Sequence, residues 1–530
     1  MNRNLYVGSA LLARQALRRD KVLIAVWFAS LVSVAYASAA ATPTLYPTET
    51  DRIIAGTGFN ASPAIVALYG PILDVRSLGE ISMTKMTVLY AVFVAGLFVV
   101  LVRRHTRGDE ESGRTELIGG TAVGRRAPLT AALVESGLVA VVLGLLTGIA
   151  NTLGGLPLAG SMAFGASWAG IGLGAAGLSA VSCQLSASSR TCGAISAGVI
   201  GAWYLVRAVG DTSWSWLSWL SPFGWSTQLR AYSGTRWWVL ALFLVLAVAL
   251  VGLALVLRDR RDLGAGLVAD RPGRVEGPPS LNGPLGLVLH LNRSTLITWS
   301  VASGVLGAVL GAIAPNISDL LKSAAAQEMM QRLGGVGAVK DTFVAAEISM
   351  SAVVITGFAI TLVGRAAADE NQGRTNLVLG SPVSRGRVFA ASTGLVVVGS
   401  AWLLAVIGTS VSLGFAAVDG QVLEELGKVV PAALAQLPAV LVTAALAVLC
   451  WAWRSSWAPY GWGILVGFLT LGQLGELFSL PDAVIKLSPY THAPTMPVAS
   501  FDPVTAAVLN GIAAGIFALA WWCYRERDLA

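Results

Sequence analysis

A long internal repeat constrains this chain more than any other feature. Residues 109–125, read as DEESGRTELIGGTAVGR, recur without a gap as residues 369–385, DENQGRTNLVLGSPVSR. Gly113 pairs with Gly373, so the copies are 260 positions apart in a chain of 530 residues. Self-similarity at about half the chain length predicts two copies of one structural unit.

Three shorter matches occur in the same order and at similar separations. A four-residue match is weak alone, but this order supports duplication of the whole unit. The pairs are 80–83 with 347–350, 220–223 with 487–490, and 261–263 with 527–529.

The composition predicts that these units lie in a lipid bilayer. The chain is 55% hydrophobic and 12% charged, about half the charge of an ordinary globular domain. Apolar runs of about 20 residues are long enough to cross about 30 Å of hydrocarbon. We therefore expect an all-α integral membrane protein with twelve transmembrane helices, arranged as two tandem six-helix halves with pseudo-twofold symmetry. The predicted spans are 22–41, 84–102, 129–150, 162–185, 191–209, 237–257, 295–314, 348–364, 388–416, 429–453, 457–479 and 504–524.

The spans divide the chain into four parts. Residues 1–21 have apolar residues at helical spacing among basic ones and predict an interfacial N-terminal helix. A cleaved signal peptide ending near Ala39 is the less favoured alternative, because 21 residues precede the apolar run. The first half covers 22–263, a Pro- and Gly-rich cytoplasmic linker covers 264–290, and the second half covers 291–530.

The distribution of charge predicts the orientation in the membrane. With the N-terminus inside, the inner segments hold most of the 36 Lys and Arg residues. Basic residues mark the cytoplasmic face, so both termini and both repeated segments are expected there, in a bacterial cytoplasmic membrane. The net charge of +7 then reflects topology and lipid contact, and no nucleic-acid partner is expected.

The sequence lacks the motifs of several kinds of ligand-binding and catalytic site. The Gly427-Lys428 pair lacks the other residues of a phosphate-binding loop. His105, His290 and His492 have no metal-ligand spacing, so we expect no metal site, no catalytic residues and no cofactor in this chain.

The repeated segment itself predicts a short helix at the membrane surface. Acids precede its Gly and Arg follows, an order that suits the helix dipole, while Leu117 and Leu377 offer an apolar contact. Such a helix is suited to docking a soluble partner. A plain solvated loop is the alternative, but two copies that keep the same residue at nine positions favour docking.

Together these features resemble the membrane subunits of type-two, ABCG-like ATP-binding-cassette exporters. The shared features are six spans per half, an interfacial first helix, the Gly-Arg-Thr segment after span two and a Ser-Pro-aromatic segment before span six. The fused form without its own ATPase is most similar to actinobacterial polyketide-antibiotic exporter permeases, and the resemblance covers the whole chain. It implies a permease that moves amphiphilic small molecules out of the cell with two copies of a separate ATPase subunit, which binds ATP and Mg²⁺.

The resemblance also implies site residues. The repeated segments would be coupling helices that contact the ATPase, and the Ser-Pro elements would be re-entrant on the outer side. Asn376 stands where the first copy has Glu116, so the two contacts need not be equivalent. The implied coupling residues are Glu110, Gly113, Arg114, Thr115, Glu116, Glu370, Gly373, Arg374 and Thr375, and the outer ones are Pro222, Phe223, Pro489 and Tyr490.

In such permeases the second and fifth spans surround a central cavity. The residues that this arrangement implies near substrate are Met83, Met86, Tyr90, Phe93, Met350 and Phe358. In this interpretation, Glu80 and Glu347 begin the second span of each half. Three roles are open: the two acids form an outer gate, bind a co-transported cation, or only anchor the span at the membrane interface. Glu135, inside the inner leaflet, is expected to pair with an inner Arg.

The repeat also predicts an asymmetry. Met83 lies 26 positions before Asp109, whereas Met350 lies 19 positions before Asp369. Seven extra helical residues would carry span two of the first half about 10 Å farther into the cytoplasm.

Two other classes remain as alternatives. An ion-gradient-driven carrier also has twelve spans and a central linker, but residues 103–114 lack the loop spacing of such carriers. An intramembrane transferase would need a cluster of catalytic carboxylates or histidines, and the sequence has no obvious one.

Overall fold

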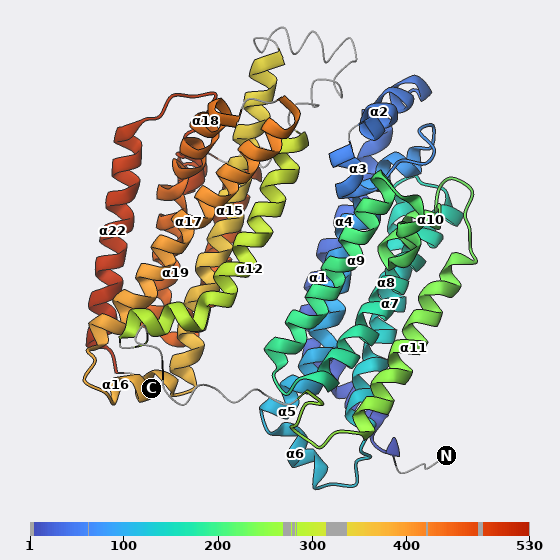
Figure 1. Ribbon diagram of the computed structural model, residues 1–530, viewed down its shortest axis with the longest axis horizontal. Helices are drawn as coiled ribbons and strands as arrows, with labels where there is room; N and C mark the ends of the chain where they lie inside the picture. The colour runs from blue at the N-terminus through green and yellow to red at the C-terminus, as the bar shows by residue number, and fades with distance from the viewer. Residues whose placement is uncertain are drawn as a thin grey trace. The chain divides into compact units, whose positions relative to one another are not determined.

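The chain folds into helices in two compact units. The computed structural model describes residues 5–61, 63–268, 277, 281, 283–313, 336–419, 422–474 and 481–528, and these contain no strand. The units cover Met1–Gly273 and Arg274–Ala530 (Figure 1). The boundary falls inside the predicted linker, as expected for a chain built from two halves.

The first unit is built around six long helices. Short helices close its two ends: α2, α3 and α10 lie at one end, and α5 and α6 at the other (Figure 1). The elements are α1 (Ser9–Leu45), α2 (Glu49–Ala61), α3 (Pro63–Tyr69), α4 (Leu78–Arg103), η2 (Arg104–Gly108), α5 (Asp109–Glu111), α6 (Arg114–Gly119), α7 (Ala127–Leu153), α8 (Leu158–Leu185), α9 (Ser189–Thr212), η3 (Ser215–Leu220), α10 (Pro222–Gln228) and α11 (Val239–Asp259).

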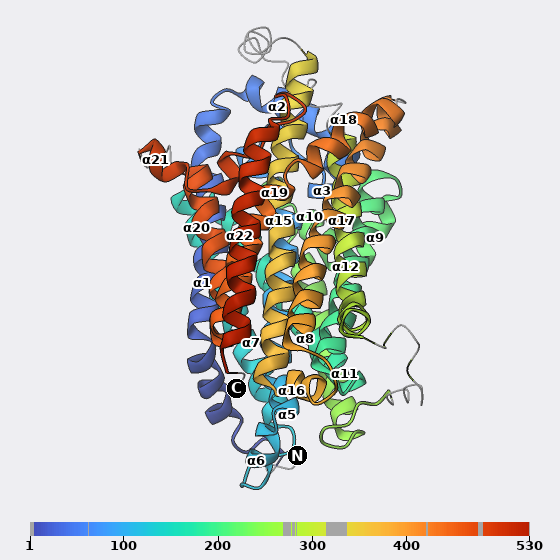
Figure 2. The ribbon, with the colours of Figure 1, turned by 90° about the vertical axis from the view of Figure 1, so that its left-hand side faces the viewer.

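The second unit repeats this order. The short helix α16 lies at one end of the unit and α18 at the other (Figure 2). The elements are α12 (Pro284–Ile313), α15 (Val336–Asn371), α16 (Arg374–Leu379), α17 (Arg385–Asp419), α18 (Val422–Leu434), α19 (Leu437–Trp453), η6 (Ser455–Trp457), α20 (Tyr460–Leu474), α21 (Asp482–Ile485), η7 (Pro489–Thr491) and α22 (Pro503–Glu526).

Within the described residues, eleven helical segments are long and apolar enough to cross a membrane. They match eleven of the twelve predicted spans and confirm an all-α, multi-span membrane protein. The remaining span, 457–479, begins as the apolar helix α20, and its last residues lie outside the described part of the chain.

The helix bounds differ from two predicted domain boundaries. The predicted interfacial helix of residues 1–21 is continuous with the first span from Ser9 on, because α1 runs without a break from Ser9 to Leu45. The linker is also shorter than 264–290. The Leu267 and Val268 amides donate to the carbonyls of Gln184 and Leu185 at the end of α8, and α12 already begins at Pro284. Much of the remainder, including 269–276, lies outside the described residues.

The sequence predicts that the second span of the first half extends farther than its counterpart. In the structure, the two second spans differ in where they begin relative to Glu80 and Glu347. The first-half helix is continuous from Leu78 to Glu111, so its extra residues are helical. However, α15 begins at Val336, 11 positions before Glu347, whereas α4 begins 2 positions before Glu80. The two helices are therefore similar in length, and Glu347 does not begin its span.

Glycine allows a close contact between two long helices of the first unit. A Cβ atom on Gly144 of α7 would lie 2.6 Å from the carbonyl oxygen of Gly165 on α8. Backbones approach this closely in membrane bundles only where small residues face each other. Gly137, two turns earlier on α7, has open space around the corresponding position.

This contact generates a stability prediction. Gly144→Val should lower the thermal unfolding midpoint of the purified protein, because overpacking typically costs about 1–3 kcal/mol. Gly137→Val on the same helix is the matched control and should leave the midpoint nearly unchanged. Equal midpoints for the two variants would contradict the close α7–α8 contact.

Candidate functional site

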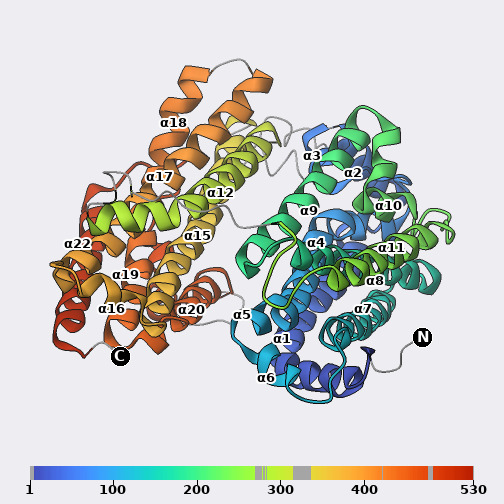
Figure 3. The same cartoon turned by 60° about the horizontal axis from the view of Figure 1, so that its bottom comes forward.

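The repeated segment forms the same short structure in both units. Gly113 and Gly373 have φ angles of 72° in each case, in the left-handed region, and helices α6 and α16 follow immediately. The predicted short helix between spans two and three is confirmed. Figure 3 shows α6 beside the first turns of α1 in the first unit.

In the first unit, Glu110 is held inside the protein. Its Oε2 accepts hydrogen bonds from Arg107 Nη1 at 2.7 Å and Arg261 Nη1 at 3.0 Å, and its Oε1 accepts from Arg261 Nη2 at 2.6 Å. Arg107 lies in the π-helical turn η2, and Arg261 follows the end of α11. One carboxylate therefore ties the repeated segment to the ends of spans two and six.

The second unit repeats this arrangement. Glu370 Oε2 accepts from Arg527 Nη2 at 2.6 Å and from the indole nitrogen of Trp451 at 3.1 Å. Arg527 follows α22 as Arg261 follows α11. Two of the sequence repeats, the Asp-Glu segment and the Arg-Asp-Leu tripeptide, thus meet in space in each half. We call each of these contacts the Glu–Arg anchor.

The anchors change the interpretation of the coupling residues. Glu110 and Glu370 have almost no exposed side-chain surface, so they are not presented to a partner as expected. A buried carboxylate needs paired donors, and the interior arginines, with Trp451 in the second unit, supply them. Thr115 is buried as well, and Thr375 is half-buried.

Other residues of the segment do face outward. Leu117 on α6 is 80% exposed and Leu377 on α16 is 79% exposed, at equivalent positions. Arg114 and Arg374 are also exposed, and each contacts an acid of its own segment, Asp109 or Asp369. Glu116 and Asn376 complete this outward face.

The Ser-Pro elements are packed within their own units. Ser221 Oγ donates to the Trp203 carbonyl at 2.7 Å, and Ser488 Oγ donates to the Phe468 carbonyl at 2.9 Å. Each serine thereby ties its element back to the fifth span of its half. These elements are structural closures at the far end from α6 or α16, and not open gates.

The aromatic and proline residues around these serines are enclosed too. Pro222, Phe223 and Pro489 are buried. The Tyr490 hydroxyl lies 2.7 Å from Thr356 Oγ1 on α15, and burial raises the pKa of Tyr490. Their predicted place in re-entrant elements on the outer side stays a prediction.

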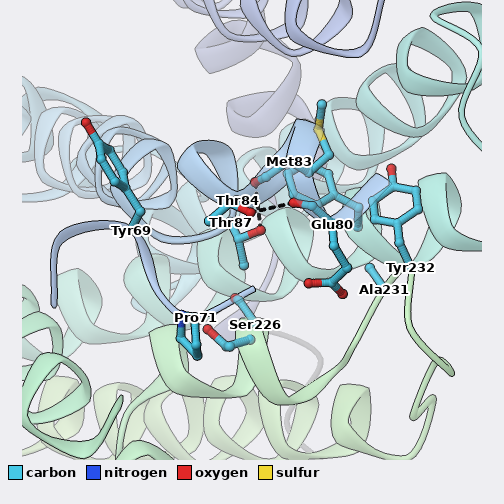
Figure 4. Close-up of a pocket in the computed structure, with 11 residues that line it drawn as sticks. Tyr69, Pro71, Glu80, Met83, Thr84, Thr87, Ser226, Ala231 and Tyr232 are labelled. Atoms are coloured by element: carbon cyan, nitrogen blue, oxygen red, sulfur yellow. Dashed lines mark hydrogen bonds between the residues drawn. The ribbon is translucent and has the colours of Figure 1, made fainter. Parts of the chain in front are cut away.

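Glu80 lies in a small pocket at the start of α4. Ser233 Oγ donates to its carboxylate at 2.7 Å, and Figure 4 shows the side chain reaching towards Ala231 and Ser226. Tyr232 closes one side, and burial raises the pKa of its phenol to about 12. Glu347 is half-buried, well inside α15, so the two acids are not equivalent gate residues as predicted.

Three of the residues expected near substrate belong to the cores of their halves. Met83 packs beside Asn151, whose Nδ2 lies 3.3 Å from the sulfur, and the Trp168 indole donates to the Met86 carbonyl at 3.1 Å. Phe358 packs edge-on against Trp299 at 5.7 Å between ring centroids. These side chains are enclosed within single units, and their role in lining a central cavity stays a prediction.

The remaining three are more accessible. Phe93 and Met350 are half-exposed, and Tyr90 packs against Phe93 with ring centroids 5.9 Å apart. These are the predicted path residues whose exposure still permits contact with a substrate.

A buried charged cluster lies beside the first Glu–Arg anchor. His105 Nε2 lies 2.9 Å from Asp20 Oδ2 and 3.5 Å from Glu135 Oε2. The three residues come from η2, α1 and α7, and their ligand atoms lie within 4.8 Å of one another. The sequence predicts an arginine partner for Glu135. The arginines of this cluster pair with other acids instead, since Arg104 contacts Asp20 and Arg19 contacts Asp109. An acid in an apolar span was the sequence signal for this cluster.

This architecture defines a multi-pass membrane protein of permease type, and comparison with known proteins identifies its family. A family described as the multidrug efflux system permease Rv1217c, C-terminal domain, matches residues 15–257 and 281–525. The multidrug efflux system permease protein Rv1217c of Mycobacterium tuberculosis (strain ATCC 25618 / H37Rv) is 37% identical over 526 residues, covering 99% of this chain and 96% of the relative. The chain belongs to this family of efflux permeases, which supports the resemblance to actinobacterial exporter permeases over a gradient-driven carrier.

The second anchor generates a stability prediction. Arg527→Ala would leave Glu370 buried without its guanidinium, and breaking a buried ion pair costs about 3–5 kcal/mol. The thermal midpoint of the purified protein should fall by several degrees. Arg525→Ala, which removes an exposed guanidinium two residues away, is the control. An equal, small effect of both changes would show that the anchor contributes little.

Proposed function

We propose that this chain is the membrane permease subunit of an ATP-driven exporter for amphiphilic small molecules, including drugs. Two copies of a separate ATPase subunit dock on α6 and α16, and ATP with Mg²⁺ binds on that ATPase. The relative from Mycobacterium tuberculosis carries the name of a multidrug efflux permease, which supports this kind of cargo. The permease itself catalyses no reaction.

The observation that carries the proposal is the pair of exposed leucines on anchored helices. A single exposed leucine is ordinary on a protein surface. Leu117 and Leu377 are exposed at equivalent positions of two short helices whose bases are held by buried ion pairs. Rigidly held apolar side chains among charged neighbours are typical centres of a docking site.

The Glu–Arg anchors give such docking a mechanical consequence. In the first half, Glu110 links the base of α6 to the end of α11 through Arg261 and to η2 through Arg107. A force applied to α6 therefore reaches spans two and six together. In the second half, Glu370 links α16 to the end of α22 in the same manner. Movement of either ATPase subunit would be passed to its half of the permease.

The two docking sites differ in charge. Glu116 on α6 corresponds to Asn376 on α16, so the first site carries one more acid. Charge at the edge of an interface changes association rate and partner choice more than it changes affinity. The two copies of the ATPase subunit would therefore bind at unequal rates.

The orientation follows from the same proposal. ATP is available in the cytoplasm, so α6, α16 and both chain termini face it across the bacterial cytoplasmic membrane. The excess of basic residues on the predicted inner segments supports this orientation. The elements around Glu80 and Ser488, at the opposite ends of their units, then face outward.

Changing the exposed leucines tests the proposal. The double variant Leu117→Asp/Leu377→Asp should lose most of its co-purifying ATPase. ATP-dependent drug transport in proteoliposomes should fall at least about tenfold, because desolvated apolar anchors dominate binding energy. The insertion and thermal midpoint of the permease should not change.

A matched control is Leu423→Asp. Leu423 is 87% exposed on α18, at the other end of the second unit from α16. This variant should bind the ATPase normally. Normal ATPase binding and transport by the double variant, or wild-type transport that proceeds equally without ATP, would refute the proposal and revive the gradient-driven carrier.

A further inference from the structure

We propose that Asp20, His105 and Glu135 form a binding site for a first-row divalent metal ion of the Zn²⁺ type at the base of the first half. Their ligand atoms lie within 4.8 Å of one another. Ligands that share one Zn²⁺ at about 2.0–2.2 Å lie roughly 3–3.5 Å apart. The distances from His105 Nε2 to Asp20 Oδ2, 2.9 Å, and to Glu135 Oε2, 3.5 Å, already match this separation.

Glu135 supplies an independent reason to expect a ligand. Its side chain is fully buried, and neither carboxylate oxygen has a hydrogen-bond partner among the described residues. The nearest donor, His105 Nε2, is already bonded to Asp20. A buried carboxylate without a partner is costly, and buried charges are normally paired or coordinate metals.

The neighbouring groups prepare the imidazole and the carboxylates for an ion. His105 Nδ1 faces Asp109 Oδ2 at 3.7 Å, the arrangement of a metal-binding histidine with a carboxylate behind it. Arg19 holds Asp109 at 3.0 Å, and Arg104 contacts only Oδ1 of Asp20, at 3.2 Å, which leaves Oδ2 for the ion. Metal binding would release the proton shared by His105 Nε2 and Asp20.

The second half builds the same helix junction with different residues at two of these positions. The repeat pairs His105 with Arg365 and Glu135 with Leu395, both 260 positions later. Arg365 Nη1 donates to Asn292 Oδ1 at 3.2 Å and also contacts Thr295, both on α12, and Leu395 is buried. The fold therefore does not require a carboxylate at the position of Glu135, which indicates that the first half keeps this acid for a ligand.

A pocket open at the surface near α6 reaches one of the three proposed ligands, His105. This pocket of about 780 Å³, including the part open to solvent, is lined by His105 and Asp109 together with Arg19 and Thr115. A bound ion would join α1, η2 and α7, and the same pocket is also lined by residues of α6. This inference does not depend on the proposed function, since metal binding can be measured on the permease alone.

The test uses the full-length protein without a histidine tag, purified in detergent. After treatment with EDTA, the protein is dialysed against Zn²⁺, and bound metal is counted by inductively coupled plasma mass spectrometry. The wild type should hold about one Zn²⁺ per chain, and Zn²⁺ should raise its thermal midpoint. Mg²⁺ should not replace it, because Mg²⁺ prefers oxygen ligands.

Three variants make the result specific. Glu135→Gln preserves shape and should weaken Zn²⁺ binding at least tenfold, and Asp109→Asn should weaken it about tenfold through the histidine. The double variant His105→Arg/Glu135→Leu carries the residues that the second half uses. It should elute as folded protein in size-exclusion chromatography and bind no ion at this site.

Either of two outcomes would overturn the proposal. One is a wild type that holds no stoichiometric Zn²⁺ and whose thermal midpoint responds to pH but not to the metal, which would make the cluster a proton-linked ion-pair network. The other is a Glu135→Gln variant that binds Zn²⁺ as tightly as the wild type, which would place the ion elsewhere.

Discussion

The buried pairing of a glutamate with an arginine at the base of each half is the interaction on which the rest of the structure depends. Glu110 with Arg261 and Glu370 with Arg527 join the short helix after span two to the end of span six. Removing one partner of a buried pair is far more costly than exchanging exposed charges. The pair therefore explains why two distant motifs recur together, and it makes each short helix a rigid extension of its bundle.

Duplication kept this frame and allowed the details to diverge. Glu116 became Asn376, and the junction that holds His105 in the first half holds Arg365 in the second. Glu80 starts its helix, whereas Glu347 lies 11 positions inside its own. The shared parts position α6 and α16, while the differing parts lie around them. A permease with two unequal sides is the expected result.

Periodicity and hydropathy predicted the helices well because both are local properties of the sequence. They could not predict burial around Met83, Met86 or Phe358, because helices that are apolar on all sides do not reveal which face turns inward. The cluster of Asp20, His105 and Glu135 was missed because its members are distant in sequence and meet only through packing. Each anchor joins two motifs whose repetition is visible in the sequence. Repetition alone does not show that the two motifs contact each other.

Native mass spectrometry of the permease with its ATPase partner tests the central claim most directly, because it counts subunits without assuming a cargo. The account predicts one permease chain with two ATPase subunits, since α6 and α16 present the same anchored leucine. It also predicts that either leucine, replaced singly by Asp, removes one ATPase subunit and leaves the other bound. A complex that holds a single ATPase subunit, or that keeps both in each single variant, would contradict it.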